Sequence, residues 1–148
     1  MERVTEHLYA MTDIKGCNPG YVITSEGVVV VDTPQLPTRA VEMREEVLAK
    51  GSIRFLINTE HHMDHIVGNY FFAGRCPVIG HEHILKEIWK VSSGLDPYDY
   101  MVDLLKKHDP PGITLLPSKD EFLGPISHGH WFGKLWSHRP EVECWPHL

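Results

Sequence analysis

The sequence predicts a single α/β domain, and three observations lead to this expectation. Segments 21–24 and 28–31 are rich in β-branched residues and flank a short turn at 25–27, which is typical of a hairpin. Apolar residues at helical spacing follow over 38–50, and another apolar strand follows over 53–57. A strand, a helix and a strand in succession form a βαβ unit, so the strands at 28–31 and 53–57 are predicted to be parallel.

The other elements follow from the same patterns. The four valines of 28–31 do not alternate with polar residues, so this strand is expected to be buried on both faces. Asp96 and Pro97 have the residue types of a helix start, and they predict a helix that ends near His108. The remaining expected elements are a first strand within 4–11, a short helix over 66–72, a strand over 77–80, a helix over 82–91 and a strand over 113–116.

Composition and charge argue against several classes of partner. The chain has 148 residues, 42% of them hydrophobic, and a formal net charge of −6, so one folded domain is expected. It has no basic stripe, which argues against nucleic acid. The apolar run at 28–31 is too short for a membrane span, and the N-terminus lacks the features of a secretory signal. We therefore expect a cytoplasmic protein with no membrane partner.

The stretch 58–65, Asn-Thr-Glu-His-His-Met-Asp-His, is the densest group of metal-ligand residue types in the chain. It follows a predicted strand, and open α/β sheets usually place their sites at such carboxyl ends. Residues two apart on an extended turn point the same way, so Glu60 and His62 are candidates to share one metal, and Asp64 and His65 to hold a second. Two such cations would bridge a water, lower its pKa and clamp a substrate oxygen. The alternative is a solvated polar turn without a metal.

The motif and its surroundings resemble the metallo-β-lactamase superfamily. The family signature, Thr-His-x-His-x-Asp-His, corresponds to residues 59–65, and the resemblance covers about residues 4–90. The similar segments, in the family's order, are Asn18, 20–23, 27–33, 55–59, 68–69 and 77–82. The resemblance implies an α/β fold (α+β in some schemes) that is an αββα sandwich with a metal centre at one edge. Because the chain is about long enough for the first half of that fold plus a tail, we expect an incomplete or half sandwich.

The resemblance also implies roles for individual residues. His62 corresponds to a ligand of the first metal, and Asp64 and His65 correspond to ligands of the second. Glu60 stands where the family has its leading histidine; as a harder, anionic donor it makes iron or manganese alternatives to zinc, the expected metal. Asp32 corresponds to the family's strand-end aspartate and is expected to support a ligand. The predicted ligands of one or two divalent ions are therefore Glu60, His62, Asp64 and His65, with Asp64 also catalytic as the residue that orients the attacking hydroxide.

The ligands that the family takes from its second half find no clear match. His130 lies in a Gly-His-x-x-Gly segment with the spacing of the family's later histidine, which makes it a candidate ligand. No bridging aspartate follows it, and His138 and His147 lack the context of the final histidine. We therefore predict a metallo-β-lactamase-like domain over 1–117 and an atypical, poorly ordered tail over 118–148 that is rich in histidine and tryptophan.

These expectations support a metal-dependent hydrolase that uses a metal-bound hydroxide on a small-molecule substrate. The family hydrolyses C–O, C–N, C–S or phosphoester bonds, and the lack of an export signal favours an intracellular ester, lactone or thioester. The alternative is a truncated, non-catalytic fragment of such a hydrolase, because the pattern weakens after about residue 117. Half a sandwich would expose one sheet face, so such a chain would aggregate or pair with a second copy as a homodimer.

Overall fold

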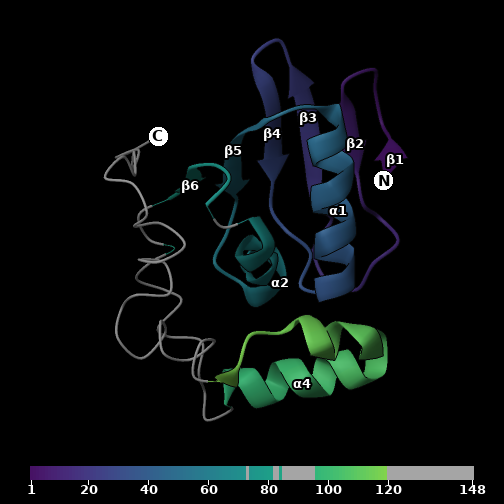
Figure 1. Cartoon of the computed structure of the whole chain (residues 1–148), viewed down its shortest axis with the longest axis vertical. Coiled ribbons are helices and arrows are strands. Elements are labelled where there is room, and N and C mark those ends of the chain that lie inside the picture. Colours follow the sequence, from purple (N-terminus) through teal and green to yellow (C-terminus); the bar gives the residue numbers. More distant parts are fainter. Residues whose placement is uncertain (73, 82–83, 85–95, 120–148) are drawn as a thin grey trace.

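The structure, a computed structural model, describes residues 1–72, 74–81, 84 and 96–119 (Figure 1). Its centre is a six-stranded mixed sheet in which the spatial order of the strands follows their order in the sequence. The pairs from β1 to β4 are antiparallel, and the pairs from β4 to β6 are parallel. This sheet with its helices confirms the predicted α/β class. The strands are β1 Glu2–Arg3, β2 Leu8–Ala10, β3 Gly20–Thr24, β4 Gly27–Val31, β5 Ile53–Asn58 and β6 Val78–Gly80.

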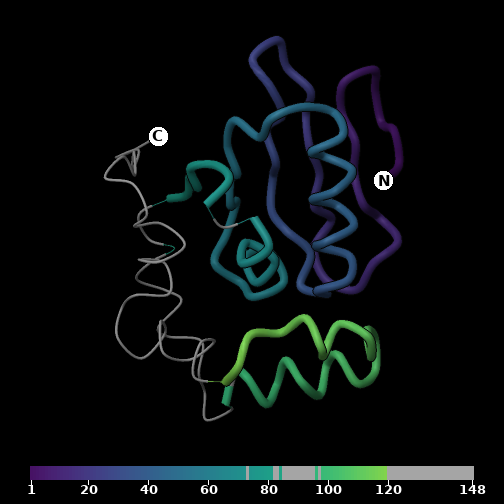
Figure 2. Tube along the Cα trace, in the orientation of Figure 1, coloured from purple at the N-terminus to yellow at the C-terminus, as the bar shows by residue number. Residues whose placement is uncertain are grey.

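The predicted βαβ unit is present. Strands β3 and β4 form the hairpin, and β4 runs parallel to β5, to which the helix α1 (Pro37–Lys50) connects it. Figure 2 shows this crossover against one face of the sheet. Ala40, Met43 and Val47 recur at helical spacing and are fully buried, so they form the apolar stripe that packs α1 on the sheet.

Strand β4 differs from the prediction of burial on both faces. Val28 and Val30 are fully buried in the core beside α1, whereas Val29 and Val31 are half-buried on the opposite face. Because 28–31 are all valine, the sequence does not show which of these residues face the core and which face the opposite side. Half-buried residues of neighbouring strands are paired with one another and form two rows on this opposite face, which we call the second face. One row is Leu8, Val22, Val29 and Phe55, and the other row is Val31, Ile57 and Ile79.

The strand predicted within 4–11 is observed only over its later part, as β2, because the residues before it form a bend. The hydroxyl of Thr5 accepts hydrogen bonds from the backbone N–H groups of His7 and Leu8, at 3.4 and 3.1 Å. Such local side-chain bonds compete with the sheet ladder and bend the chain. The result is two short antiparallel strands, β1 and β2, on either side of the bend.

Residues 113–116, where another strand was predicted, do not form a strand, and the side chain of Asp109 accounts for the difference. Its buried carboxylate accepts from the backbone N–H of Gly112 at 3.2 Å, and the chain forms the 3-10 helix η3 (Pro110–Leu115) instead of a strand. The same carboxylate accepts from the backbone N–H and the hydroxyl of Thr38, at 3.0 and 2.8 Å. Asp109 therefore caps α1 from a distant segment and ties η3 to the start of that helix.

The helix predicted from Asp96 is confirmed as α4 (Pro97–His108). No helix among the described residues is both long and apolar enough to cross a membrane. The predicted helix over 82–91 lies outside the described residues, apart from Ile84, and so does the predicted tail from residue 120 onward. The division into a domain over 1–117 and a tail over 118–148 therefore stays a prediction.

Candidate metal centre

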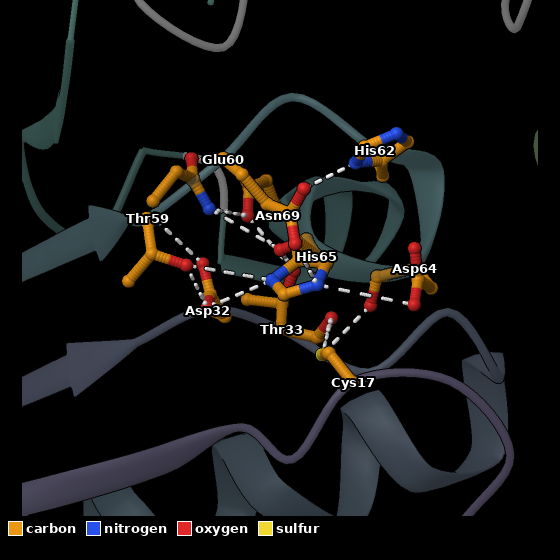
Figure 3. A network of polar contacts seen from close by, with 10 residues as sticks. Cys17, Asp32, Thr33, Thr59, Glu60, His62, Asp64, His65 and Asn69 are labelled. Atoms are coloured by element: carbon orange, nitrogen blue, oxygen red, sulfur yellow. Dashed lines mark hydrogen bonds and ion pairs between the residues drawn. The ribbon is translucent and has the colours of Figure 1, made fainter.

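The motif at 58–65 lies at the carboxyl edge of the parallel strands. Strands β4 and β5 end side by side in register, so the residues that follow the two strands meet at this edge. Asp32 and Thr33 come from the end of β4, and they face the motif that leaves β5 (Figure 3). The sheet thus assembles the polar cluster from two segments of the chain.

The helix after the motif starts earlier than predicted. The expected helix over 66–72 is observed as α2 (Met63–Ile66), followed by the 3-10 helix η1 (Val67–Phe72). His62 is the N-cap residue of α2, with an extended backbone. Asp64 and His65 therefore lie within the single turn of α2, where the His65 ring lies beside Asp32 and the Asp64 carboxylate lies on the side of that ring away from Asp32 (Figure 3).

The carboxylate of Glu60 joins two histidines of the motif. Its Oε1 lies 2.7 Å from Nε2 of His65, and its Oε2 makes a close contact with Nδ1 of His62. The hydrogen bond with His62, together with the nearby charges of His65 and His61, holds the pKa of Glu60 below its usual value. The structure therefore brings together Glu60, His62 and His65, which are three of the four predicted ligands.

Asp64, the fourth predicted ligand, lies close to His65 but does not bond to it. Its Oδ2 is 3.9 Å from Nε2 of His65. The Asp64 side chain keeps 33% of its surface exposed, against 17% for His65. Water therefore reaches the Asp64 carboxylate, while the His65 ring lies deeper in the site.

Asp32 holds the other side of the His65 ring. Its Oδ2 lies 2.9 Å from Nδ1 of His65, and its two oxygens also accept from the backbone N–H and hydroxyl of Thr59, at 2.8 and 2.6 Å. Because a carboxylate accepts hydrogen bonds, this contact assigns a proton to Nδ1 and leaves Nε2 facing Glu60. The φ of Asp32 is 54°, in the left-handed region that aspartate tolerates better than most residues.

Cys17 is a site neighbour that sequence reasoning missed. Its Sγ lies 2.8 Å from the carbonyl oxygen of Asp64, and the residue is buried. Burial, followed by the negative charges of Asp32 and Asp64, raises the pKa of Cys17 to about 12, so the thiol keeps its proton and donates. At Gly16, with φ of 111°, an added Cβ would lie 2.6 Å from Nε2 of Gln35, so the approach of this loop depends on glycine.

Three further polar residues lie beneath His65 and were also missed as site residues. Thr33, Asn58 and Asn69 are 0%, 3% and 1% exposed, and Figure 3 shows Thr33 and Asn69 beside the His65 backbone. Each stands in a segment that resembles the superfamily, which is the one signal in the sequence that could have marked them. Buried polar side chains need partners, so their positions indicate a built network.

The donor set fits a divalent cation in its chemistry, since imidazole and carboxylate are ligands of zinc, iron and manganese. As placed, these groups bond to one another, and no group of three or more His, Cys, Asp or Glu side chains within the described residues is arranged to hold a metal. Two donors on one tetrahedral zinc, each at about 2.0 Å, lie about 3.3 Å apart. The donors of Glu60 and His65 are 2.7 Å apart, so a modest side-chain shift would admit a cation. His130, His138 and His147 lie outside the described residues.

Comparisons with known proteins bear on the fold and the family of this chain. The family model described as "Metallo-beta-lactamase superfamily" matches residues 13–142. Among solved structures, the DIM-1 metallo-β-lactamase exposed to ceftazidime is similar at 19% identity and a TM-score of 0.51, covering 58% of this chain and 45% of that one. A metallo-β-lactamase from Pontibacter korlensis is similar at 20% identity and a TM-score of 0.51, covering 65% and 49%.

The chain thus spans about half the length of these solved structures. A search of curated proteins finds no match. At such identities the solved structures show the fold alone, whereas the family match extends over most of the sequence. On the strength of that match and of the shared fold, the chain belongs to the metallo-β-lactamase superfamily.

Proposed function

We propose that this protein is a metal-dependent hydrolase in which Glu60, His62, Asp64 and His65 hold one or two divalent cations. The observation that carries the proposal is the meeting of the Glu60 carboxylate with both imidazoles at the edge where β4 and β5 end. Superfamily membership supports the same chemistry at the level of the family. A bound cation would supply a Lewis acid that polarises the scissile bond and activates water.

Three residues of the chain would have separate roles beside the cation. Asp32 fixes the ring of His65 through Nδ1, so that Nε2 is the nitrogen presented to a cation. Asp64 keeps an accessible carboxylate next to this ring, and its Oδ2 is placed to orient the attacking water and accept its proton. Glu60 adds a second negative charge, which stabilises a cation more than a neutral histidine would.

We also propose the cation, the substrate class and the location of this hydrolase. Zinc is the expected cation, and the carboxylate donor at Glu60 makes iron or manganese an alternative. The substrate would be a small molecule with an ester, lactone, thioester or related bond. We propose a cytoplasmic location, with neither nucleic acid nor membrane as a partner.

Metal counting by mass spectrometry tests the proposal. Wild type, His62→Ala, Asp64→Ala and the control His7→Ala would each be loaded with zinc or manganese, desalted and measured. His7 is an exposed histidine on the chain before β2, with a side chain that is 63% exposed, so its loss leaves the centre untouched. We expect wild type and His7→Ala to retain metal and to hydrolyse an ester, lactone or thioester, and the two site variants to lose both properties. Equal, negligible metal in all four proteins would sink the proposal.

The second candidate is a non-catalytic chain that self-associates through its second face. The observation that favours it is the pair of half-buried apolar rows that cross the sheet, in which Val29 is paired with Val22 on one side and Phe55 on the other. A contiguous apolar patch of this kind marks an association surface or an aggregation liability. Size-exclusion chromatography with light scattering separates the candidates: a metal-loaded monomer supports the hydrolase, whereas a discrete metal-free dimer supports self-association.

A further inference from the structure

The backbone carbonyl of His65 is held by three donors. It accepts from the backbone N–H of Thr33 at 2.9 Å, from the hydroxyl of Thr33 at 3.1 Å and from Nδ2 of Asn58 at 3.2 Å. Carbonyls in the last turn of a helix lack helical partners, and α2 is a single turn. Groups from the ends of β4 and β5 thus supply the partners that the short helix lacks.

A buried pair of amides fixes these donors. Nδ2 of Asn69 donates to Oδ1 of Asn58 at 2.7 Å, and Nδ2 of Asn58 lies 3.3 Å from Oδ1 of Asn69. The hydroxyl of Thr33 also lies 2.9 Å from Oδ1 of Asn69, so it shares its single proton between that oxygen and the His65 carbonyl. All three side chains are buried, where an unpaired polar group is costly, and the network therefore favours one arrangement.

His65 is consequently anchored at two points. Thr33 and Asn58 hold its peptide plane, and Asp32 holds Nδ1 of its ring at 2.9 Å. With both ends fixed, the bonds between backbone and ring have little freedom, and Nε2 is directed to one place. A ligand that is held before the metal arrives loses less conformational entropy on binding.

We propose that Thr33, Asn58 and Asn69 are positioning residues that clamp the carbonyl of His65 and thereby set the metal affinity of its ring. The proposal rests on the proposed function, because it takes His65 as a metal ligand. None of the three side chains needs to touch the cation. Their contribution is the placement of a ligand through its own backbone.

Cobalt(II) titration, followed by its visible absorption, tests the clamp in the full chain. Thr33→Val keeps the shape and the backbone N–H but removes the hydroxyl, and Thr33→Ser restores the hydroxyl. Thr38→Val is the matched control, because it removes a hydroxyl that donates to Asp109, in a cap between α1 and η3 that takes no part in the motif. We expect Thr33→Val to weaken cobalt binding about tenfold or more and to shift the absorption bands, as loss of supporting contacts does in metal sites. Thr33→Ser and Thr38→Val should bind as wild type does.

A metal-free measurement keeps the clamp testable if Thr33→Val does not fold. In nitrogen-15 NMR spectra of the wild type, the side-chain amide protons of Asn58 and Asn69 should exchange slowly with solvent. Rapid exchange, as for exposed amides, would overturn the clamp.

The outcomes separate the two proposals. Cobalt binding that is equal in wild type and Thr33→Val overturns the clamp and leaves the hydrolase proposal standing. Weak binding by Thr33→Ser as well as Thr33→Val also overturns the clamp, because the hydroxyl would then not be the cause. If the wild type binds no cobalt, the proposed function fails together with the link to metal affinity, and slow amide exchange then supports only the geometric part of the clamp.

Discussion

Glu60 is the side chain that most changes what this centre would bind. It occupies the place of the leading histidine in the motif that the sequence resembles, and it contacts both His62 and His65. A carboxylate is a harder donor than an imidazole and carries a full negative charge. The choice between metals should therefore depend on this one residue more than on its neighbours.

Restoring the histidine gives a direct prediction. Glu60→His should raise the preference for zinc over manganese by about tenfold, a change of the size that altered surroundings of a metal produce. Competition between the two cations, monitored by metal counting, measures this ratio. Glu60→Gln is the matched control, since it removes the charge without adding an imidazole and should weaken both cations. An unchanged ratio in Glu60→His would argue that Glu60 is not a ligand.

At this scale the sequence identified the ligand types and, through the family resemblance, Asp32 as a support, but it did not identify the other supporting residues. Glu60, His62, Asp64 and His65 lie within six consecutive positions, so their proximity could be predicted from spacing alone. Cys17 contacts the Asp64 carbonyl across 47 positions, and no local pattern encodes such a contact. The role of the four predicted ligands toward a metal stays a prediction.

At the scale of elements, α4 depends on its N-cap. Asp96 accepts hydrogen bonds from the backbone N–H groups of Tyr98 and Asp99 and forms an ion pair with Lys119 at 2.8 Å. The hydrogen bond from Lys119, followed by those from the backbone of Asp99 and Tyr98, holds the pKa of Asp96 below its usual value. The ionised carboxylate therefore stabilises the folded state.

The sign of this shift predicts a pH dependence for Asp96→Ala. A lowered folded-state pKa gives stability that is present above the unfolded pKa of about 3.9 and is lost as the pH falls through the folded value. The urea midpoint of Asp96→Ala should therefore lie below that of wild type at pH 7, and the difference should shrink toward pH 3. Asp96→Asn, which keeps a capping oxygen without the charge, should fall between the two at pH 7. A difference that does not vary with pH would contradict this account.

Helices and strands with a clear pattern of apolar residues could be predicted from the sequence. Elements whose form depends on the hydrogen bonds of a single side chain could not. The stripe of α1 and the apolar runs of β3, β4 and β5 follow from local pattern, and their pairing follows from the βαβ rule. The bend at Thr5 and the 3-10 turn after Asp109 depend on individual hydrogen bonds. Such bonds override the weak propensities of short apolar segments.

For the whole molecule, the two faces of the sheet should respond differently to charge. Val30 is fully buried in the core, whereas its neighbour Val29 is half-buried on the second face. Val30→Lys would place an unpaired charge in the core and should reduce the free energy of unfolding by about 4 kcal/mol. Val29→Lys should preserve the fold and suppress any self-association of the wild type.

Circular dichroism with urea titration and sedimentation velocity measure these two effects. Equal losses of stability in Val29→Lys and Val30→Lys would show that both faces are enclosed in solution. Self-association that persists in a folded Val29→Lys protein would show that the second face is not the contact surface.

The strand order has a consequence for the order in which the parts of the protein fold. Each strand pairs with its predecessor in the sequence, so a chain leaving the ribosome can extend the sheet by successive addition at a growing edge. The centre draws on the ends of both β4 and β5, and it can form only when the second of these strands docks. We expect pulsed hydrogen exchange during refolding to protect the β3–β4 hairpin before the amide of Thr59, which bonds to Asp32. Simultaneous protection would show instead that hairpin and centre form in one step.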